Sequence, residues 1–551
     1  MKKLHIISLL IALAPPAFTQ QTPIHISQTA IYDFIDELSL LNIIDVNNVV
    51  KPYPDKFIYN SLKKAEKQQS TLNNRQQKEL AFYLQEYSYF QKEATGSTSK
   101  TKMGQLLHKY HLSVLPPRFR YRDSLFFATA RLIWGTRYYK NDKGLNFHRW
   151  GGGSFNAHIG EHFAAYGSLR DNNITELFSK KEYLTDFPGG NFKGRKKGGG
   201  DYSEIRGGLT YSWTWGSIGM VKDHVEWGTN YHGANILSSR APSYAQIKFH
   251  LKPVKWFEFN YLHGWLVSNV IDSTRSYVTA DGVRRDVMHP KYIAANMFTL
   301  TPFRGIHLSV GNSIIYSDLN PHPAYFIPFL FYKSVDHWLN STDGVGTNVG
   351  QNSQMFANVS ILRLKHFHFY GSLFLDELKF DRIRNPDLHN FWNYKAGIKY
   401  ADGLIPNLAL TAEYTRTSPI TYEHIVSTTT FESNGYNLGH YLRSNSDELY
   451  FALTYKPLPR LLIRAEYIHA RHGKSFQYTS GQTAVMHPFM EEVKWENTIY
   501  NLLLRYEFAY NSFLTASYQY NNATGEDVKL FTPEFYQGQN HTLSFGFNFG
   551  F

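Results

Sequence analysis

The last eleven residues of the chain, 541–551, alternate between two kinds of side chain along their whole length. Large apolar residues occupy the odd positions from 543 to 551, and small or polar residues occupy the even positions between them. Because successive side chains of a strand point to opposite faces, one face of this segment is apolar and the other is polar. A strand that separates lipid from a water-filled lumen requires this pattern. The sequence therefore predicts a transmembrane β-barrel.

The same two-residue period returns repeatedly after Arg118. It is clearest in residues 209–215, 408–415, 449–456, 501–508 and 514–520. Charged residues recur on the face opposite the apolar one, so water must reach that face, which favours a wide lumen. Residues 119–551, at roughly 24 residues for each strand and its connection, give about 16 to 18 antiparallel strands. We expect an all-β transmembrane barrel of this size, preceded by a small helical region.

The first 19 residues have the order of parts of a secretory signal peptide. Lys2 and Lys3 precede an apolar run at residues 6–14, and residues 17–19 place small side chains at positions −3 and −1 before Gln20. The apolar run is too short to cross a membrane as a helix. We expect cleavage near Gln20; the alternative is a buried N-terminal helix.

Between the signal peptide and the barrel, residues 20–118 have a helical period. One apolar stripe consists of Ile31, Phe34, Ile35, Leu38 and Leu41. Its spacing of three and four residues is that of a single helix face. Asn73 and Gln76 have the spacing of a capping box at the start of a later helix, and Pro116 with Pro117 marks the passage to the barrel. We expect this region in the periplasm, packed against the barrel mouth.

Composition excludes several classes of site. The chain has no cysteine, which excludes a lipoprotein anchor, disulfides, thiolate metal sites and a cysteine nucleophile. Phe, Tyr and Trp make up 16% of the residues, as aromatic girdles at two membrane interfaces would require. After the signal peptide, no apolar run approaches the roughly 20 residues of a membrane helix. The mean hydropathy of −0.39 agrees with a barrel, because only alternate residues face lipid.

Motifs of catalysis are absent from the sequence. It contains neither a Gly-x-Ser-x-Gly elbow nor a His-Glu-x-x-His helix. His366 and His368 share one strand face, but two ligands are too few for a zinc site. Asp376 and Glu377 are adjacent, so they point to opposite faces and cannot flank one glycosidic bond. We therefore expect no enzyme, no cofactor and no metal; a hydrolase site assembled from distant residues stays open as an alternative.

The basic character of the chain suggests where an anionic ligand could bind. The formal net charge is +12, and for an exported barrel nucleic acid is not an expected partner. Arg195, Lys196 and Lys197 lie in a glycine-rich segment, residues 186–201, which lacks the Gly-Lys-Ser/Thr of a phosphate loop. We take these three residues as candidates for contact with acidic polysaccharide; the alternative is a solvated loop.

Two arginines are candidates on the lumen face. Arg464 and Arg505 fall on the polar face of their predicted strands, where they would attract acidic polysaccharide or lipid phosphate. Glu466 and Glu507 lie two residues further on, on the same face. The alternative is therefore that these acids neutralise the arginines within the barrel interior.

The order of several short segments resembles the capsule assembly Wzi family. These segments are residues 31–38, 51–54, 72–80, 226–243, 315–317, 325–330 and 370–377. The most specific is residues 226–243, which is similar to the family's Trp-Gly segment with its following aliphatic-Ser and Ala-Pro strand. The chain departs from the family by having Trp227-Gly-Thr-Asn230 in place of Trp-Gly-Pro-Gly, and Asn312-Ser313 where a glutamate is frequent.

The resemblance implies an 18-stranded outer-membrane barrel that binds or organises surface polysaccharide in a lectin-like, non-catalytic way. The chain also resembles outer-membrane barrels in its last residue, Phe551, an aromatic side chain that the barrel assembly machinery reads. We therefore expect surface polysaccharide, outer-membrane lipid and that machinery as partners of a monomer. The alternative is a carbohydrate-selective or general porin, which needs an open lumen where the anchor needs a closed one.

Overall fold

A computed structural model describes residues 21–90, 109–175, 180–193, 199–318, 320–340, 350–385, 388–478 and 485–550. The predicted signal peptide and the terminal Phe551 lie outside these residues. So do Arg195, Lys196 and Lys197.

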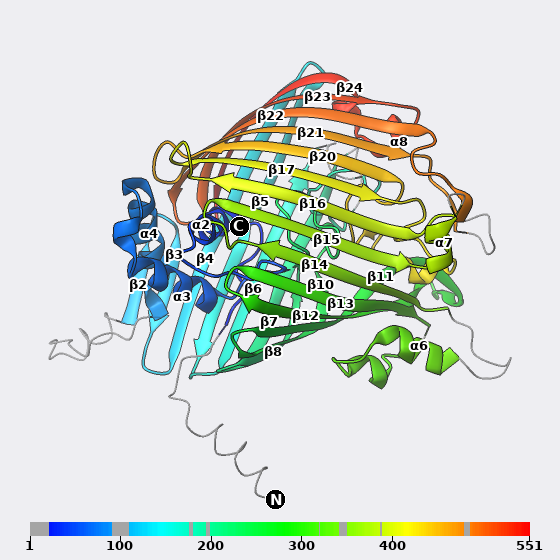
Figure 1. The fold of residues 1–551 in the computed structure, drawn as a ribbon, viewed down its shortest axis with the longest axis horizontal. Helices are drawn as coiled ribbons and strands as arrows, with labels where there is room; N and C mark the ends of the chain where they lie inside the picture. The colour runs from blue at the N-terminus through cyan, green and yellow to red at the C-terminus, as the bar shows by residue number, and fades with distance from the viewer. Residues whose placement is uncertain are drawn as a thin grey trace, which may run out of the picture.

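Eighteen antiparallel strands close into a barrel (Figure 1), which confirms the predicted fold class and places the strand number at the upper end of the expected range. In chain order the strands are β4 (Phe126–Asn141), β5 (Gly144–Ile159), β6 (Phe163–Ile174), β7 (Gly200–Trp213), β8 (Gly216–Asp223), β10 (Tyr244–Val254), β11 (Phe257–Val278), β12 (Arg284–Phe303), β13 (Ile306–Ser317), β14 (Asn352–Ile361), β15 (Phe367–Glu377), β16 (Phe391–Ala401), β17 (Leu408–Thr417), β20 (Ser446–Tyr455), β21 (Leu461–Gly473), β22 (Val493–Ala509), β23 (Ser512–Thr524) and β24 (Gly538–Phe549).

The seam of the barrel joins β24 to β4, with Phe549 opposite Trp134. Beyond the end of β24, the short strand β3 (Arg118–Arg122) continues along the same edge of β4, and β2 (Tyr110–Ser113) pairs with β3. The final strand shows why the alternation forms a wall. Leu543 is 49% exposed on the outer face, whereas its neighbour Thr542 is 2% exposed on the inner face.

The two ends of the barrel differ in the length of their connections. At one end the strands are joined by short turns, such as residues 214–215 and 510–511, and at the other most connections are longer, such as residues 418–445. Short turns mark the periplasmic end of bacterial outer-membrane barrels. The helices α2 (Thr29–Leu40), α3 (Asp55–Glu66) and α4 (Asn74–Glu86) lie at the short-turn end (Figure 1).

The helical region forms as the sequence predicts. Ile31, Phe34, Ile35 and Leu38 are all buried in one apolar cluster with side chains of α3 and α4. Asn73 and Gln76 form the predicted capping box, each side chain bonding the other's backbone N–H at 3.0 Å. Helix α4 is fixed to the barrel turns, because Arg75 Nε donates to Asn407 Oδ1 at 2.8 Å. The short helices η1 (Gln69–Thr71) and η2 (Ser88–Phe90) flank α4.

Two long connections fold into the lumen. Residues 224–243 contain β9 (Glu226–Trp227), and residues 418–445 contain η4 (Ser427–Thr429), β18 (Glu432–Ser433) and β19 (Tyr436–Asn437). Their apolar side chains pack with the inner faces of the wall strands in one core cluster. Its members include Trp227, Ile236, Leu237, Ala295, Met297, Phe356, Phe374, Phe431 and Leu438. The polar inner face that was expected to meet water is therefore largely covered by the chain itself.

A third connection lies on the outside of the barrel. Residues 320–340, with η3 (Pro323–Phe326) and α6 (Tyr332–Asn340), lie beside the lower wall in Figure 1. Asn296 of β12 points away from the lumen, because its neighbours on both sides belong to the inner core cluster. Its Nδ2 donates to the carbonyl oxygens of Pro328 and Leu330 at 2.9 Å. On β13, Asn312 Oδ1 accepts from the Tyr332 N–H at 2.9 Å. Outward polar residues thus satisfy backbone that would otherwise face lipid unpaired.

The remaining helices are α7 (Phe380–Arg384), α8 (Val528–Phe531) and η6 (Glu534–Tyr536), at the long-connection end. Within the described part of the chain, no helix has the length and apolar character needed to cross a membrane.

Replacing Asn312 with Leu should release the outer segment from the wall, because the Tyr332 N–H would be left unsatisfied, at a cost of about 1–3 kcal/mol. The chain has no native cysteine, so an environment-sensitive dye can be attached to Ser334→Cys in bilayers. We expect its emission to move toward that of water in Asn312→Leu, while the same dye on Ser427→Cys stays unchanged. Equal spectra at position 334 with and without the substitution would contradict this contact.

Candidate functional site

The lumen holds a cavity of about 300 Å³ between helix α2 and the inward connections, and we call it the upper cavity. Tyrosine rings and charged groups line it together. The residues that matter most for its chemistry are Asp33, Asp36, Glu226, Tyr231, Arg240 and Arg464. Aromatic faces beside fixed polar groups are the lining that a sugar ring needs.

The floor of this cavity is the polar face of α2. Asp33 forms ion pairs with Arg505 at 2.9 Å and with Arg464 at 3.6 Å. Burial alone would raise the pKa of Asp33, but Arg464 and Arg505 outweigh it and lower the pKa to about 2. One turn further along, Asp36 pairs with Lys399 and accepts from the Tyr231 hydroxyl at 2.7 Å. The helix is thus held across the barrel mouth by charges on the wall.

A second set of charges links α2 to α4. Glu37 pairs with Arg75 of α4 and, at 2.9 Å, with Lys456 in the turn after β20. Burial opposes ionisation of Glu37, yet Lys456 and Arg75 lower the pKa of this carboxyl well below its usual value. Glu79 accepts a hydrogen bond from the other terminal guanidinium nitrogen of Arg75, Nη1, at 2.6 Å. The helical region and the barrel therefore share one network of buried ion pairs.

The wall of the cavity is built by residues 224–243. Glu413 of β17 accepts from the backbone N–H of Tyr231, and at 3.0 Å from that of His232. Lys395 of β16 pairs with Glu413 at 3.0 Å and donates to the carbonyl oxygen of His232 at 2.7 Å. Both charged side chains are buried, so each needs the other and the backbone of the connection. This pair holds the connection inside the barrel.

His232 joins three segments at the top of the cavity. Its ring lies parallel to that of Tyr450, with centroids 4.5 Å apart. Its nitrogens lie 3.3 Å from Glu448 and 3.7 Å from Asp186. Although burial opposes the charged form, Glu448 raises the pKa of His232 to about 9. The ring is therefore cationic at neutral pH. It links residues 224–243 to Glu448 of β20 and to Asp186.

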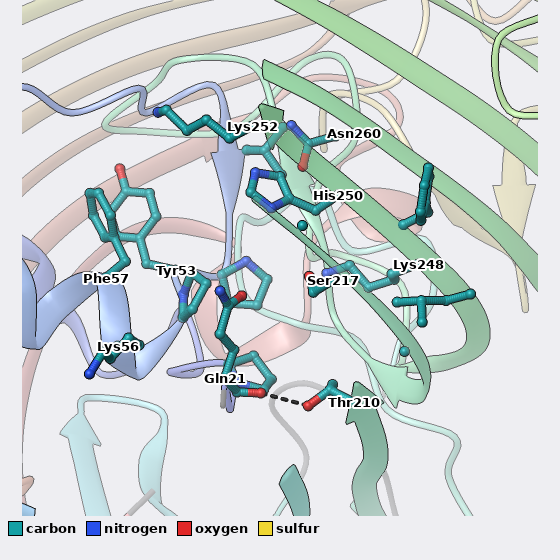
Figure 2. Close-up of a pocket in the computed structure, with 18 of the residues that line it drawn as sticks. Gln21, Tyr53, Lys56, Phe57, Thr210, Ser217, Lys248, His250, Lys252 and Asn260 are labelled. Carbon is teal, nitrogen blue, oxygen red and sulfur yellow. Dashed lines mark hydrogen bonds between the residues drawn. The ribbon is translucent and has the colours of Figure 1, made fainter. Parts of the chain in front are cut away.

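A second cavity, of about 340 Å³, opens toward the short-turn end, and we call it the lower cavity. Figure 2 shows Tyr53 and Phe57 on one side and Ser217, His250 and Asn260 on the opposite side. The hydroxyl of Thr210 donates to the carbonyl oxygen of Gln21 at 2.7 Å, which ties the N-terminal segment to the wall. Lys252 and His250 both contact Glu258, at 2.8 and 3.3 Å.

A two-stranded sheet separates the two cavities. β1 (Val50–Lys51) comes from the helical region and pairs with β9, with Val50 opposite Trp227 and Lys51 opposite Glu226. Val50 and Trp227 line the lower cavity, whereas Lys51 and Glu226 line the upper one, because adjacent strand residues point to opposite faces. The Lys51–Glu226 ion pair measures 2.8 Å. We call the sheet formed by Val50, Lys51, Glu226 and Trp227 the partition.

The predicted site residues have different positions. Arg464 lines the upper cavity, and Arg505 lies beneath it against α2. Their ion-pair partner is Asp33; the predicted neighbours Glu466 and Glu507 instead accept from tyrosine hydroxyls of Tyr450 and Tyr83. The structure thus brings two of the five candidates together at the floor, and the three of the basic loop lie outside the described residues.

Sequence reasoning missed the acids of α2 and the residues that the inward connections contribute. Asp33, Asp36 and Glu37 have the three-and-four spacing of one polar helix face, and this signal could have identified the floor. Tyr231 and Arg240 had no local signal. His366 and His368 do not converge: His368 bonds Tyr231 and Ser360, while His366 bonds the carbonyl oxygen of Ala401 at the end of β16.

Replacing Glu413 with Gln should destabilise the protein by about 3–5 kcal/mol, because Lys395 would keep a buried charge without its partner. We expect a lower thermal unfolding temperature, read by heat-modified gel migration. In Glu413→Gln/Lys395→Met the buried charge is gone, so much of the loss should be recovered. A double variant no more stable than the single one would argue against a paired-charge role.

The His232–Glu448 contact should make the position of residues 224–243 sensitive to alkaline pH. The folded-state pKa of about 9 lies above the usual 6.5, so this stabilisation is complete below about pH 6.5 and is lost as pH rises through 9. Protease cleavage within residues 224–243 should therefore increase between pH 7 and 10. In His232→Gln this additional increase should be absent; an identical pH profile in both proteins would contradict the assignment.

Comparison with known proteins places the chain in a family. The family described as capsule assembly protein Wzi matches residues 206–532. Among solved structures, Wzi of Escherichia coli, described as an outer-membrane protein involved in group 1 capsule assembly and a carbohydrate-binding β-barrel, superposes with a TM-score of 0.56. That comparison has 12% identity and covers 95% of this chain and 98% of the other; at this identity it shows the fold.

Two other solved structures are less similar to this chain. OprD of Pseudomonas aeruginosa gives a TM-score of 0.40 at 7% identity, covering 76% of this chain and 94% of that one. OccAB2 of Acinetobacter baumannii gives 0.42 at 10% identity, covering 76% and 97%. TM-scores below 0.5 support no conclusion here. No curated protein matches the chain.

The barrel is an outer-membrane protein, as its strand pattern predicted. The family match covers more than half of the chain, and the protein belongs to the capsule assembly protein Wzi family.

Proposed function

We propose that this protein binds surface polysaccharide at the outer face of the cell and anchors it there, without catalysing a reaction. The observation that carries the proposal is the filled lumen. Helix α2, the partition and the two inward connections occupy the space through which a solute would have to pass. Such an interior suits a binding protein and opposes a porin. The description of E. coli Wzi as a carbohydrate-binding barrel supports the same function.

The upper cavity is the part of the molecule that best fits a saccharide. Its volume of about 300 Å³ would accept one or two sugar rings rather than a chain. Tyr231 offers a ring face, and Arg240 and Arg464 offer cationic donors for a carboxylate or hydroxyl groups. Arg505 would act by holding α2 rather than by touching the ligand. Arg195, Lys196 and Lys197 remain proposed outer contacts for an acidic chain.

A non-catalytic role is supported by how the acids of the lumen are used. Asp33, Glu226 and Glu413 are each held in ion pairs with wall or partition bases. A general acid or base needs a carboxyl that can exchange its proton with substrate. These groups instead stabilise the plug.

We further propose that residues 20–118 form a helical region on the periplasmic side, with α2 and β1 reaching into the barrel mouth, and that residues 119–551 form the barrel. The helices lie at the end with short turns, which is the periplasmic end in bacterial barrels. We propose that the protein is a monomer and that its apolar outer face contacts outer-membrane lipid. We also propose that the barrel assembly machinery recognises Phe551.

Deleting the protein should release polysaccharide from cells without stopping its synthesis, because an anchor acts after export. The measurement compares cell-bound with free polysaccharide in deletion and complemented strains. We expect the bound fraction to fall and the total to stay constant. Attachment to an acidic polysaccharide should also weaken with added salt, since charge attraction is screened over about 8 Å at physiological ionic strength.

Two outcomes would overturn the proposal. If bound and free polysaccharide stay at wild-type levels while uptake of a small sugar falls, the protein is a porin. If labelling with a serine-directed inhibitor removes its activity on a lipid or glycan, it is a hydrolase. Charge reversal at Arg195, Lys196 and Lys197 tests the proposed outer contacts separately, and it should give only a modest loss of binding, because single ion contacts in water contribute little.

A further inference from the structure

Three metal-ligating side chains meet where the N-terminal segment touches the barrel wall. His25 precedes helix α2, Asp223 is the last residue of β8, and His224 opens the inward connection. The Nε2 of His25 lies 3.1 Å from the Nδ1 of His224. One ligand atom from each of the three residues lies within 4.8 Å of the others, and all three side chains are buried.

A fourth candidate ligand lies on the neighbouring strand. Glu204 of β7 places its Oε1 4.0 Å from the Nδ1 of His224. This oxygen is buried and accepts no hydrogen bond from any described residue. A buried polar atom of this kind usually has a partner. Its lack of one in a cluster of ligand types points to a cation.

The spacing of the two imidazoles fits a transition metal. With zinc–nitrogen bonds of about 2.0–2.1 Å in a tetrahedron, two nitrogens lie about 3.3 Å apart. The observed 3.1 Å between His25 and His224 is close to that separation. Two nitrogens with an oxygen ligand favour zinc or a related transition metal over calcium and magnesium, which prefer oxygen alone.

The surroundings hold the ligands in place. Asp223 accepts from the Tyr166 hydroxyl at 2.8 Å and from the backbone N–H of His224 at 2.9 Å. The hydroxyl of Ser27 contacts the far nitrogen of His25. Contacts of this kind orient metal ligands.

The same surroundings set a limit on affinity. Arg206 lies 3.4 Å from Asp223, and Arg170 and Lys222 add positive charge to the surroundings of the two histidines. A metal must compete with Arg206 for the Asp223 carboxylate. Binding should therefore be weaker than in a structural site of four uncontested ligands.

The lower cavity lies next to the cluster. Tyr166, Val221 and Pro23 line that cavity, and the Tyr166 hydroxyl bonds Asp223. Gln21, four residues before His25, lies at the edge of the same cavity in Figure 2.

We propose that His25, Asp223 and His224, together with Glu204, bind a divalent transition-metal cation of the zinc class. Such a cation would tie the start of the N-terminal segment to β7 and β8, next to the partition. This site is separate from the upper cavity and does not depend on the proposed polysaccharide function.

The test uses the full-length mature protein in detergent, freed of any histidine tag and treated with chelator. Zinc chloride is then titrated by calorimetry, and thermal unfolding is followed with and without zinc. We expect one zinc per chain and a higher unfolding temperature in zinc. His224→Gln should weaken binding at least tenfold, and so should His25→Gln.

Glu204→Gln is the milder variant, because its Oε1 has no hydrogen bond to lose; it should fold normally and bind zinc more weakly. His250→Gln, in the lower cavity but outside the cluster, is the matched control and should bind as the parent does. The proposal fails if the parent binds no zinc, or if the variants at positions 25, 204 and 224 bind as tightly as the control. Calcium chloride should produce no shift in unfolding temperature; an equal shift would also contradict the site.

Discussion

The ion pairs between α2 and the barrel wall are the constraint on which the rest of the interior depends. An 18-stranded barrel encloses more space than wall side chains can fill, so its lumen must hold either water or other parts of the chain. Here Asp33, Asp36 and Glu37 meet Arg505, Lys399 and Lys456. A buried charge without a partner is expensive, so neither the helix nor the wall bases are well accommodated without the other. The helical region is therefore joined to the barrel through buried ion pairs.

The partition extends this coupling to the outer side. Val50 and Lys51 of the helical region pair with Trp227 and Glu226 of the inward connection. Chain segments that enter from the two ends of the barrel therefore meet in the lumen. Above it, Glu413 and Lys395 hold the same connection by its backbone.

Local patterns could be predicted from the sequence, and contacts between distant segments could not. The period of residues 541–550, the stripe beginning at Ile31 and the capping box at Asn73 depend on neighbours within a few positions, and the structure confirms each. The inward direction of Arg505 followed from the same period. Its partner Asp33, 472 positions away, has no local signature. The outer packing of residues 320–340 and the approach of His25 to His224, 199 positions apart, have no local signature either.

The central claim is that the lumen is closed by the chain itself, and single-channel conductance in planar bilayers tests it most directly. The purified mature protein should show no stable open channel, because α2 and the partition block the path. A variant lacking residues 21–90, which removes both α2 and one strand of the partition, should conduct. Large, steady conductance from the intact protein, equal to that of the deletion variant, would contradict a closed lumen and with it the anchor function.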